Sequence, residues 1–234
     1  MKKAKVKGGS MAISRTVIIS CAGMGNRLGL GSTKALVEID GKPLVIRHLE
    51  MLDEEEDIRV VVGYQAAQVI EVVKKYRQDV TFVFNHHYRE TGTGASVALA
   101  SRYANEYILS LDGDLVIHPQ DMKKILACDH EFVSGGIPCT DDPWMLQTYQ
   151  EDGKEYVSAF SRNSGNYEWN GVTQMKSIKM QNGKGHVFQL IEPFLPVMFM
   201  KLRTREIDTI NDYERAVAWV KNKFNEKRIN GLLM

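Results

Sequence analysis

The sequence has few cysteines, and the three that it has lie far apart. Cys21, Cys128 and Cys139 do not form a cluster with the spacing of a metal site. An odd number of scattered cysteines is typical of a protein in a reducing compartment. We therefore expect a cytoplasmic location.

Long apolar runs and an excess of charge of one sign are also lacking. No stretch approaches the ~20 apolar residues that a membrane-spanning helix requires. The formal net charge is only +1, whereas nucleic-acid and membrane-surface binding usually come with a basic excess. Residues 1–12 lack the apolar core of a signal peptide and are interpreted as a leader or a disordered arm. We expect neither a nucleic-acid nor a membrane partner, and whether the chain forms a homodimer stays open.

What is present is the pattern of one α/β domain. The chain has 234 residues, of which 44% are hydrophobic and 25% charged, as in an ordinary globular protein. Buried strands are predicted at 16–20, 58–62, 80–84 and 106–111, and helices at 43–52, at 65–76 and from Ala95. Residues 35–39 are expected to be a short extended piece. Strands that alternate with helices predict a sandwich with a mostly parallel sheet.

From Glu131 the pattern changes to extended segments without regular crossovers. Extended segments are predicted at 132–137, 145–149, 156–161 and 171–178, then a helix at 187–195, a strand at 197–202 and a helix at 210–224. A loop that reaches over the site is expected to carry Arg162, Asn163, Tyr167, Glu168 and Asn170. The fold prediction is a three-layer α/β/α sandwich with a mixed, mostly parallel sheet and a small antiparallel portion.

A glycine-rich loop follows the first predicted strand. Gly23, Gly25, Gly29 and Gly31 fall within nine residues, and Arg27 and Lys34 lie within and just after them. Such a loop leaves backbone N–H groups free to face a phosphate, and the two cations add positive charge. The spacing fits neither the dinucleotide fingerprint nor the Walker A loop. A plain glycine-rich connection with two solvated cations remains the alternative.

Two acidic segments and a second glycine turn complete the candidate site. Asp112-Gly113-Asp114 directly follows the strand at 106–111, where carboxylates of an open α/β sheet meet ligands, and hard oxygen ligands suit Mg²⁺. The same three residues are also good turn residues. Asp208 precedes the last predicted helix, which Thr209 could cap, and would be a second carboxylate for the metal. The turn Thr91-Gly92-Thr93-Gly94 is assigned to base or ribose recognition.

Three motifs in this order resemble the nucleotidyltransferase superfamily: GMGNRLGLGSTKAL, LDGD and EIDTINDYERA. The resemblance implies a Rossmann-like fold and transfer of a nucleoside monophosphate to a phosphorylated sugar or small alcohol. It implies that Ala22, Gly23, Met24, Gly25 and Asn26 bind the nucleotide, that Arg27 and Lys34 act on its triphosphate, and that Asp114 and Asp208 hold Mg²⁺ near Asp112. Gly92, Thr93 and Gly94 would approach the base, and Arg162 the acceptor or the α-phosphate.

The chain also departs from this family. Thr33 stands where the family usually has proline before the loop lysine, and Arg162 stands where many relatives have lysine. The short second half is most similar to compact cytidylyltransferases that act on phosphocholine or inositol-1-phosphate. The turn at Gly92 to Gly94 is similar to that of uridylyl enzymes, so the base stays open.

The hypothesis is therefore a Mg²⁺-dependent enzyme that transfers CMP from CTP to a phosphorylated small molecule and releases pyrophosphate. A single domain is expected over residues 13–230, with a nucleotide-binding half at 13–130, an acceptor-binding half at 131–205 and a returning segment with the last helix at 206–225. One alternative is a uridylyl, guanylyl or thymidylyl transferase for sugar-1-phosphates. A glycosyltransferase that uses Asp112-Gly113-Asp114, and a non-catalytic nucleotide-binding module, are further alternatives.

Overall fold

The structure is a computed structural model that describes residues 13–29 and 31–224. The predicted leader at 1–12 lies outside the described residues. None of the helices in the described ranges combines the length and the apolar character that a membrane crossing requires.

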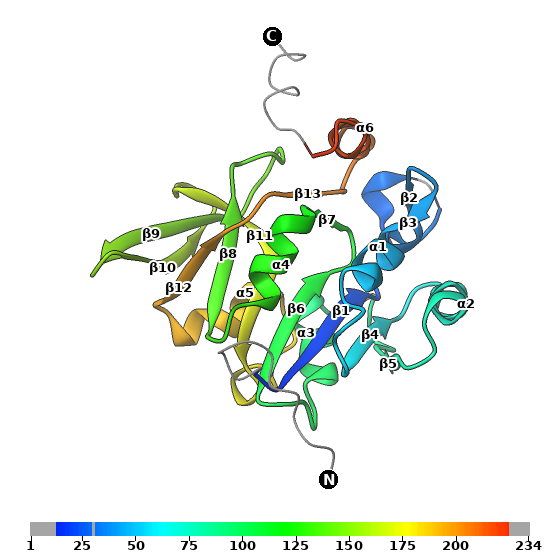
Figure 1. The fold of residues 1–234 in the computed structure, drawn as a ribbon, viewed down its shortest axis with the longest axis horizontal. Coiled ribbons are helices and arrows are strands. Elements are labelled where there is room, and N and C mark those ends of the chain that lie inside the picture. Colours follow the sequence, from blue (N-terminus) through cyan, green and yellow to red (C-terminus); the bar gives the residue numbers. More distant parts are fainter. Residues whose placement is uncertain (1–12, 30, 225–234) are drawn as a thin grey trace.

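A large mixed sheet of nine strands forms the centre of the fold, in the order β5-β4-β1-β6-β11-β8-β12-β10-β9 (Figure 1). The strands are β1 Arg15–Cys21, β4 Ile58–Val62, β5 Thr81–Phe84, β6 Tyr107–Asp112, β8 Phe132–Gly136, β9 Met145–Glu151, β10 Lys154–Ser161, β11 Tyr167–Lys176 and β12 Val197–Lys201. Parallel pairs join β5, β4, β1 and β6, and another joins β8 to β12. Only β10 and β11 run against the other strands of this sheet.

Helices cover both faces of the sheet because its strands are apolar on both sides. Val17 and Ile19 of β1 pack in one core with α1 Leu44–Glu50, α2 Ala66–Tyr76 and α4 Pro119–Leu126. Ile18, between them in the sequence, packs in the opposite core with α3 Thr93–Ala100 and α5 Val187–Ile191. Successive residues of a strand point to opposite faces. The three-layer α/β/α sandwich with a mixed, mostly parallel sheet is therefore confirmed.

A third, smaller core lies at the edge of the sandwich that carries the last helix. Trp219 of α6 Ile210–Lys221 is fully buried there, against the hairpin of β2 Glu38–Ile39 and β3 Lys42–Pro43 (Figure 1). Thr209 caps α6 as expected, because its Oγ1 accepts a hydrogen bond from the Asp212 N–H at 3.2 Å. Two short strands, β7 Leu115–Ile117 and β13 Thr204–Glu206, pair antiparallel beside this core.

Several predicted boundaries differ from the structure. The predicted strand at 171–178 is β11, which starts at Tyr167 and ends at Lys176. Tyr167, Glu168 and Asn170 therefore lie on a strand and not on the expected loop. Residues 34–36, at the start of the expected extended piece, form a short 3₁₀ helix, η2, before β2. The predicted helix at 187–195 is α5 followed by a 3₁₀ turn at Glu192–Phe194.

Candidate active site

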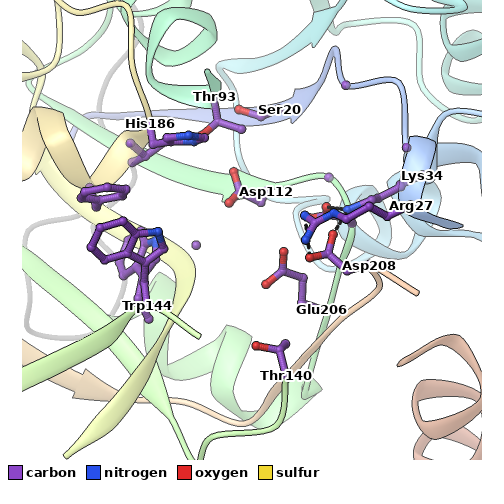
Figure 2. A pocket seen from close by; sticks show the side chains of 18 of the residues that line it. Ser20, Arg27, Lys34, Thr93, Asp112, Thr140, Trp144, His186, Glu206 and Asp208 are labelled. Carbon is purple, nitrogen blue, oxygen red and sulfur yellow. Dashed lines mark hydrogen bonds and ion pairs between the residues drawn. The ribbon is translucent and has the colours of Figure 1, made fainter. Parts of the chain in front are cut away.

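A cavity of about 360 Å³ opens at the edge of the sheet where the parallel strands β1 and β6 end. This edge is the usual ligand site of an open α/β sheet, and the volume suits a small molecule. Figure 2 shows Arg27, Lys34 and Asp208 grouped on one side of it and Trp144 on the opposite side, with Asp112 between them. The cavity thus has a charged end and an aromatic end.

The glycine loop forms part of the charged end. Gly25 has a φ of +64°, and a Cβ there would lie 3.0 Å from Lys34 Cγ and 3.1 Å from the Ser32 carbonyl oxygen. The loop therefore needs glycine at this position. Gly23, Gly25 and Arg27 line the cavity, as do Thr33 and Lys34 after the loop, whereas Ala22 and Met24 do not. Nothing is described of the side chain of Asn26.

Lys34 joins the loop to the two acidic segments. Its Nζ donates to Asp114 Oδ2 at 2.8 Å and to Asp208 Oδ1, and these groups are 12–20% exposed. Arg27 Nη2 lies 2.8 Å from Asp208 Oδ2, with its own side chain 71% exposed. Burial alone would lower the pKa of Lys34, but Asp114 and Asp208 outweigh it and raise that pKa above 10.5. Lys34 is therefore a charged ammonium at neutral pH.

The pairing of β7 with β13 brings the acidic segments together. Glu206 lies opposite Leu115, and the Ile207 N–H donates to the Asp114 carbonyl oxygen at 3.1 Å. The fully buried His48 of α1 donates from Nε2 to the Leu115 carbonyl oxygen at 2.8 Å. The segments around Asp114 and Asp208, which are far apart in sequence, thus meet through backbone hydrogen bonds.

Glu206 adds a third carboxylate that the sequence analysis missed. One carboxylate oxygen each of Asp114, Glu206 and Asp208 lie within 4.8 Å of one another. Burial, and then the charges of Asp114 and Asp208, raise the pKa of Glu206 to about 9. Three clustered carboxylates are the hard oxygen ligands that Mg²⁺ takes, so the residues present fit such an ion.

Asp112 lies between the two ends of the cavity. Gly171 of β11 has a φ of +76°, and a Cβ there would collide with the Asp112 carboxylate. Burial, and then the charge of Asp114, raise the pKa of Asp112 to about 8. Its Oδ1 is buried without a hydrogen-bond partner among the described residues. Asp112 therefore lines the cavity with one carboxylate oxygen whose hydrogen-bonding capacity is unused.

The second glycine turn packs closely against residues 185 and 186. A Cβ at Gly92 would lie 2.5 Å from the Gly185 carbonyl oxygen, and one at Gly94 would lie 2.6 Å from that of His186. Gly92 also donates its N–H to the Lys184 carbonyl oxygen at 3.1 Å. Among the three residues assigned to the base, only Thr93 lines the cavity.

Arg162 lies at the aromatic end and is engaged by other residues of the chain. Its Nη1 is 3.0 Å from Asp142 Oδ2 and donates to the Asp142 carbonyl oxygen at 2.6 Å. Its guanidinium lies 4.3 Å from the centre of the Trp144 ring, which itself packs against Phe188. Arg162 lines the cavity beside Trp144.

Glu168 holds the loop that leads to Trp144. Its carboxylate accepts hydrogen bonds from the Cys139 N–H, from the Thr140 N–H at 3.3 Å and from the Thr140 hydroxyl. Tyr167 stacks on Phe199 with ring centres 4.3 Å apart and does not line the cavity. The expectation of a loop is therefore wrong for Tyr167, Glu168 and Asn170, which β11 places within the sheet, whereas Arg162 and Asn163 do lie on the connection between β10 and β11.

One signal in the sequence pointed to Glu206. In an extended segment, residues two apart share a face, so Glu206 and Asp208 would be expected on the same side. The roles of Trp144 and His186 as wall residues had no such local signal, since they lie on loops whose positions depend on distant contacts.

Comparisons with known proteins place the chain among nucleotidyltransferases. Residues 17–165 match the family model described as the MobA-like NTP transferase domain. The bifunctional protein GlmU of Nitratiruptor is 31% identical over 66% of this chain and 39% of its own length. The choline-phosphate cytidylyltransferase of Streptococcus pneumoniae is 36% identical over 58% of this chain and 60% of its own.

The fold is shared with solved structures at lower sequence identity. A UDP-glucose pyrophosphorylase complexed with UDP-glucose superimposes with a TM-score of 0.70 at 13% identity. The superposition covers 90% of this chain and 99% of the other. In sequence, by contrast, the chain spans less than two thirds of the lengths of the curated relatives named above.

Proposed function

The chain belongs to the MobA-like NTP transferase domain family, and from this membership we propose that it transfers a nucleoside monophosphate to a phosphorylated small molecule. The observation that carries the proposal is the cluster of Lys34, Asp114 and Asp208 beside the glycine loop. Such a cluster combines a cation for phosphate with carboxylates for a divalent ion. A glycosyltransferase would have no need for a lysine and an arginine on a glycine loop.

In the proposed reaction an oxygen of the acceptor's phosphate attacks the α-phosphorus of the nucleoside triphosphate. The new P–O bond forms as the bond to the β-phosphate breaks, and pyrophosphate leaves with that electron pair. The attacking oxygen is already anionic at neutral pH, so no residue has to remove a proton. Catalysis then depends on positioning and on neutralisation of charge.

The residues of the chain divide this work between them. Gly23 and Gly25 line the cavity, and backbone N–H groups of this loop would hold the phosphates. Arg27, which is largely exposed, and Lys34 would exchange their carboxylate partners for phosphate oxygens. Asp114, Asp208 and Glu206 would hold Mg²⁺, which supplies charge neutralisation and orientation of the phosphates when bound.

CTP is the favoured donor and a phosphorylated small alcohol the favoured acceptor. The support is the choline-phosphate cytidylyltransferase, which has the higher sequence identity of the two relatives named above, 36% against 31%. A sugar-1-phosphate acceptor with UTP is the second candidate, supported by the shared fold of the UDP-glucose pyrophosphorylase. The free state of all three cysteines is compatible with the proposed cytoplasmic location.

The test is pyrophosphate release from CTP, UTP, GTP and ATP with Mg²⁺, over a panel of phosphorylated choline, polyols and hexoses. We expect release that depends on one acceptor class. D114N and D208N should lower turnover by about 10²–10³, because each removes a charge that acts on the transferred group. D53N, a change at an exposed aspartate in the turn after α1, is the matched control. Release without acceptor dependence, or full activity of D114N and D208N, would contradict the proposal.

A further inference from the structure

A single side chain ties down the end of the glycine loop. Gln65 Oε1 accepts a hydrogen bond from the Thr33 N–H at 2.9 Å, and its Nε2 donates to the Gly31 carbonyl oxygen at 3.0 Å. The Thr33 hydroxyl donates to the Gly23 carbonyl oxygen at 3.1 Å. Residues 31–33 are therefore held from two sides, by the amide of Gln65 and by the start of the loop.

The backbone of Gln65 is in an unfavourable conformation. Its φ of 51° and ψ of 37° are left-handed, immediately before α2 begins at Ala66. For a residue other than glycine, asparagine or aspartate, this conformation costs roughly 1–2 kcal/mol. A glycine would fit the backbone better, but it would lack the amide that reaches the loop. The strain therefore accompanies a contact that only a long amide side chain makes.

Thr33 shows why the loop needs this contact. Its φ of −61° and ψ of 139° are values that a proline would also adopt. Threonine does not fix φ, but unlike proline it has an N–H, and Gln65 binds that N–H. The pair of Thr33 and Gln65 thus restrains by hydrogen bonding the segment that a proline ring would restrain covalently.

The restrained segment, residues 31–33, leads directly into Lys34. Thr33 is the N-cap of η2, the 3₁₀ helix that starts at Lys34. The start of the loop packs closely on the same segment, since a Cβ at Gly25 would lie 3.1 Å from the Ser32 carbonyl oxygen and 3.0 Å from Lys34 Cγ. Lys34 Nζ in turn reaches Asp114 and Asp208.

We propose that Gln65 is a positioning residue that holds residues 31–34 so that Lys34 faces the triphosphate site. The inference rests on the proposed function only for the identity of the ligand. The restraint on the loop belongs to the unliganded protein and can be measured without a nucleotide.

The first experiment uses Q65G, with Q68A at an exposed position of α2 as the matched control. Glycine accepts the left-handed backbone and removes only the amide, so relief of strain should offset the lost hydrogen bonds and leave the thermal midpoint near that of the wild type. Hydrogen exchange of the backbone amides at 31–36 should become at least tenfold faster in Q65G and stay unchanged in Q68A. Unchanged exchange in Q65G would overturn the inference.

The second experiment measures CTP binding with Mg²⁺ by calorimetry. The loss of two neutral hydrogen bonds that order the loop should weaken CTP binding by roughly tenfold in Q65G. In the pyrophosphate-release assay, KM should change more than kcat. In a T33P background the same change should cost clearly less, because the proline ring fixes φ by itself. Equal losses in both backgrounds would contradict the role of Thr33 and Gln65 as a pair.

The two experiments separate this inference from the proposed function. If the wild type binds no nucleoside triphosphate, the proposed function fails. Faster exchange in Q65G would still support the restraint, and unchanged exchange would still reject it.

Discussion

Replacing Lys34 with methionine should lower the free energy of unfolding, because it leaves the carboxylates of the site without their ammonium partner. Methionine keeps most of the apolar stem but removes the ammonium that contacts both Asp114 and Asp208. Removing one partner of a buried ion pair typically costs about 3–5 kcal/mol, because the remaining charge is left uncompensated. Here the carboxylates are 12–20% exposed, so we expect the lower end, about 3 kcal/mol.

The assay is thermal unfolding of K34M in EDTA and in Mg²⁺, without nucleotide. A loss of about 3 kcal/mol lowers the midpoint by roughly 6–12 °C in a domain of this size. Mg²⁺ should then raise the midpoint of K34M more than that of the wild type, because the ion replaces the missing charge between the carboxylates. The deficit in EDTA should be larger at pH 9 than at pH 6, because Asp112 and Glu206 ionise within this range and Lys34 is a charge that lowers their pKa values. A raised pKa keeps Lys34 charged throughout that range, and its contribution is lost only as the pH rises through that pKa.

K42M is the control, since Lys42 also pairs with a carboxylate, Glu50, at 2.6 Å but at the exposed surface. Such pairs contribute about 0–1 kcal/mol, so K42M should unfold near the wild-type midpoint with or without Mg²⁺. The reasoning is refuted if K34M in EDTA is as stable as the wild type. If Mg²⁺ raised the midpoints of K34M and the wild type equally, the ion would not take the place of the Lys34 ammonium between the carboxylates.

Three further outcomes follow from the same structure, each measured as the free energy of unfolding in EDTA. E206Q should stabilise the protein more at pH 8.5 than at pH 5, because a raised carboxyl pKa makes ionisation of Glu206 increasingly costly between its usual value of 4.5 and about 9. Burial lowers the pKa of His48, so below pH 6.5 this histidine takes up a proton in the unfolded chain before it does so in the folded protein, and stability falls. H48Q removes this titration and should make that fall less steep by up to about 1.4 kcal/mol per pH unit. G171A should destabilise by more than about 1 kcal/mol, because it combines a positive φ with a clash against Asp112, whereas G153A in the open hairpin turn has the φ strain without a clash.

The parallel half of the fold was predictable because its signals are local. The run Ile58–Val62 is β4 as predicted, and the helix expected at 65–76 is α2 from Ala66 to Tyr76. Apolar periodicity fixes such elements whatever surrounds them. The motifs at the ends of β1 and β6 were predictable for the same reason, since the carboxyl ends of parallel strands share one edge of the sheet.

The elements that the sequence did not predict depend on contacts between distant segments of the chain. β7 and β13 have three residues each and pair only with each other, so neither has a pattern of its own. The register of β11 shifts between Trp169 and Thr173, which hides the start of the strand. α4 did have a local signal, Pro119 at its first turn, that the sequence analysis did not use. The partners of Arg162 and Glu168 lie on a loop 20 to 29 residues away and could not be inferred from either residue alone.

The charge of the cavity explains why these distant contacts matter for function. In the part of the cavity around Lys34, four carboxylates (Asp112, Asp114, Glu206 and Asp208) face two cations (Arg27 and Lys34), so full ionisation of this group would leave an excess of two negative charges. The raised pKa values of Asp112 and Glu206 allow both to hold a proton near neutral pH, which balances the site without a ligand. A divalent ion would bring the same two positive charges that these protons supply. In the unliganded protein Asp114 and Asp208 are paired with Lys34 and Arg27, so Asp112 and Glu206 would supply the negative charge that a divalent ion neutralises.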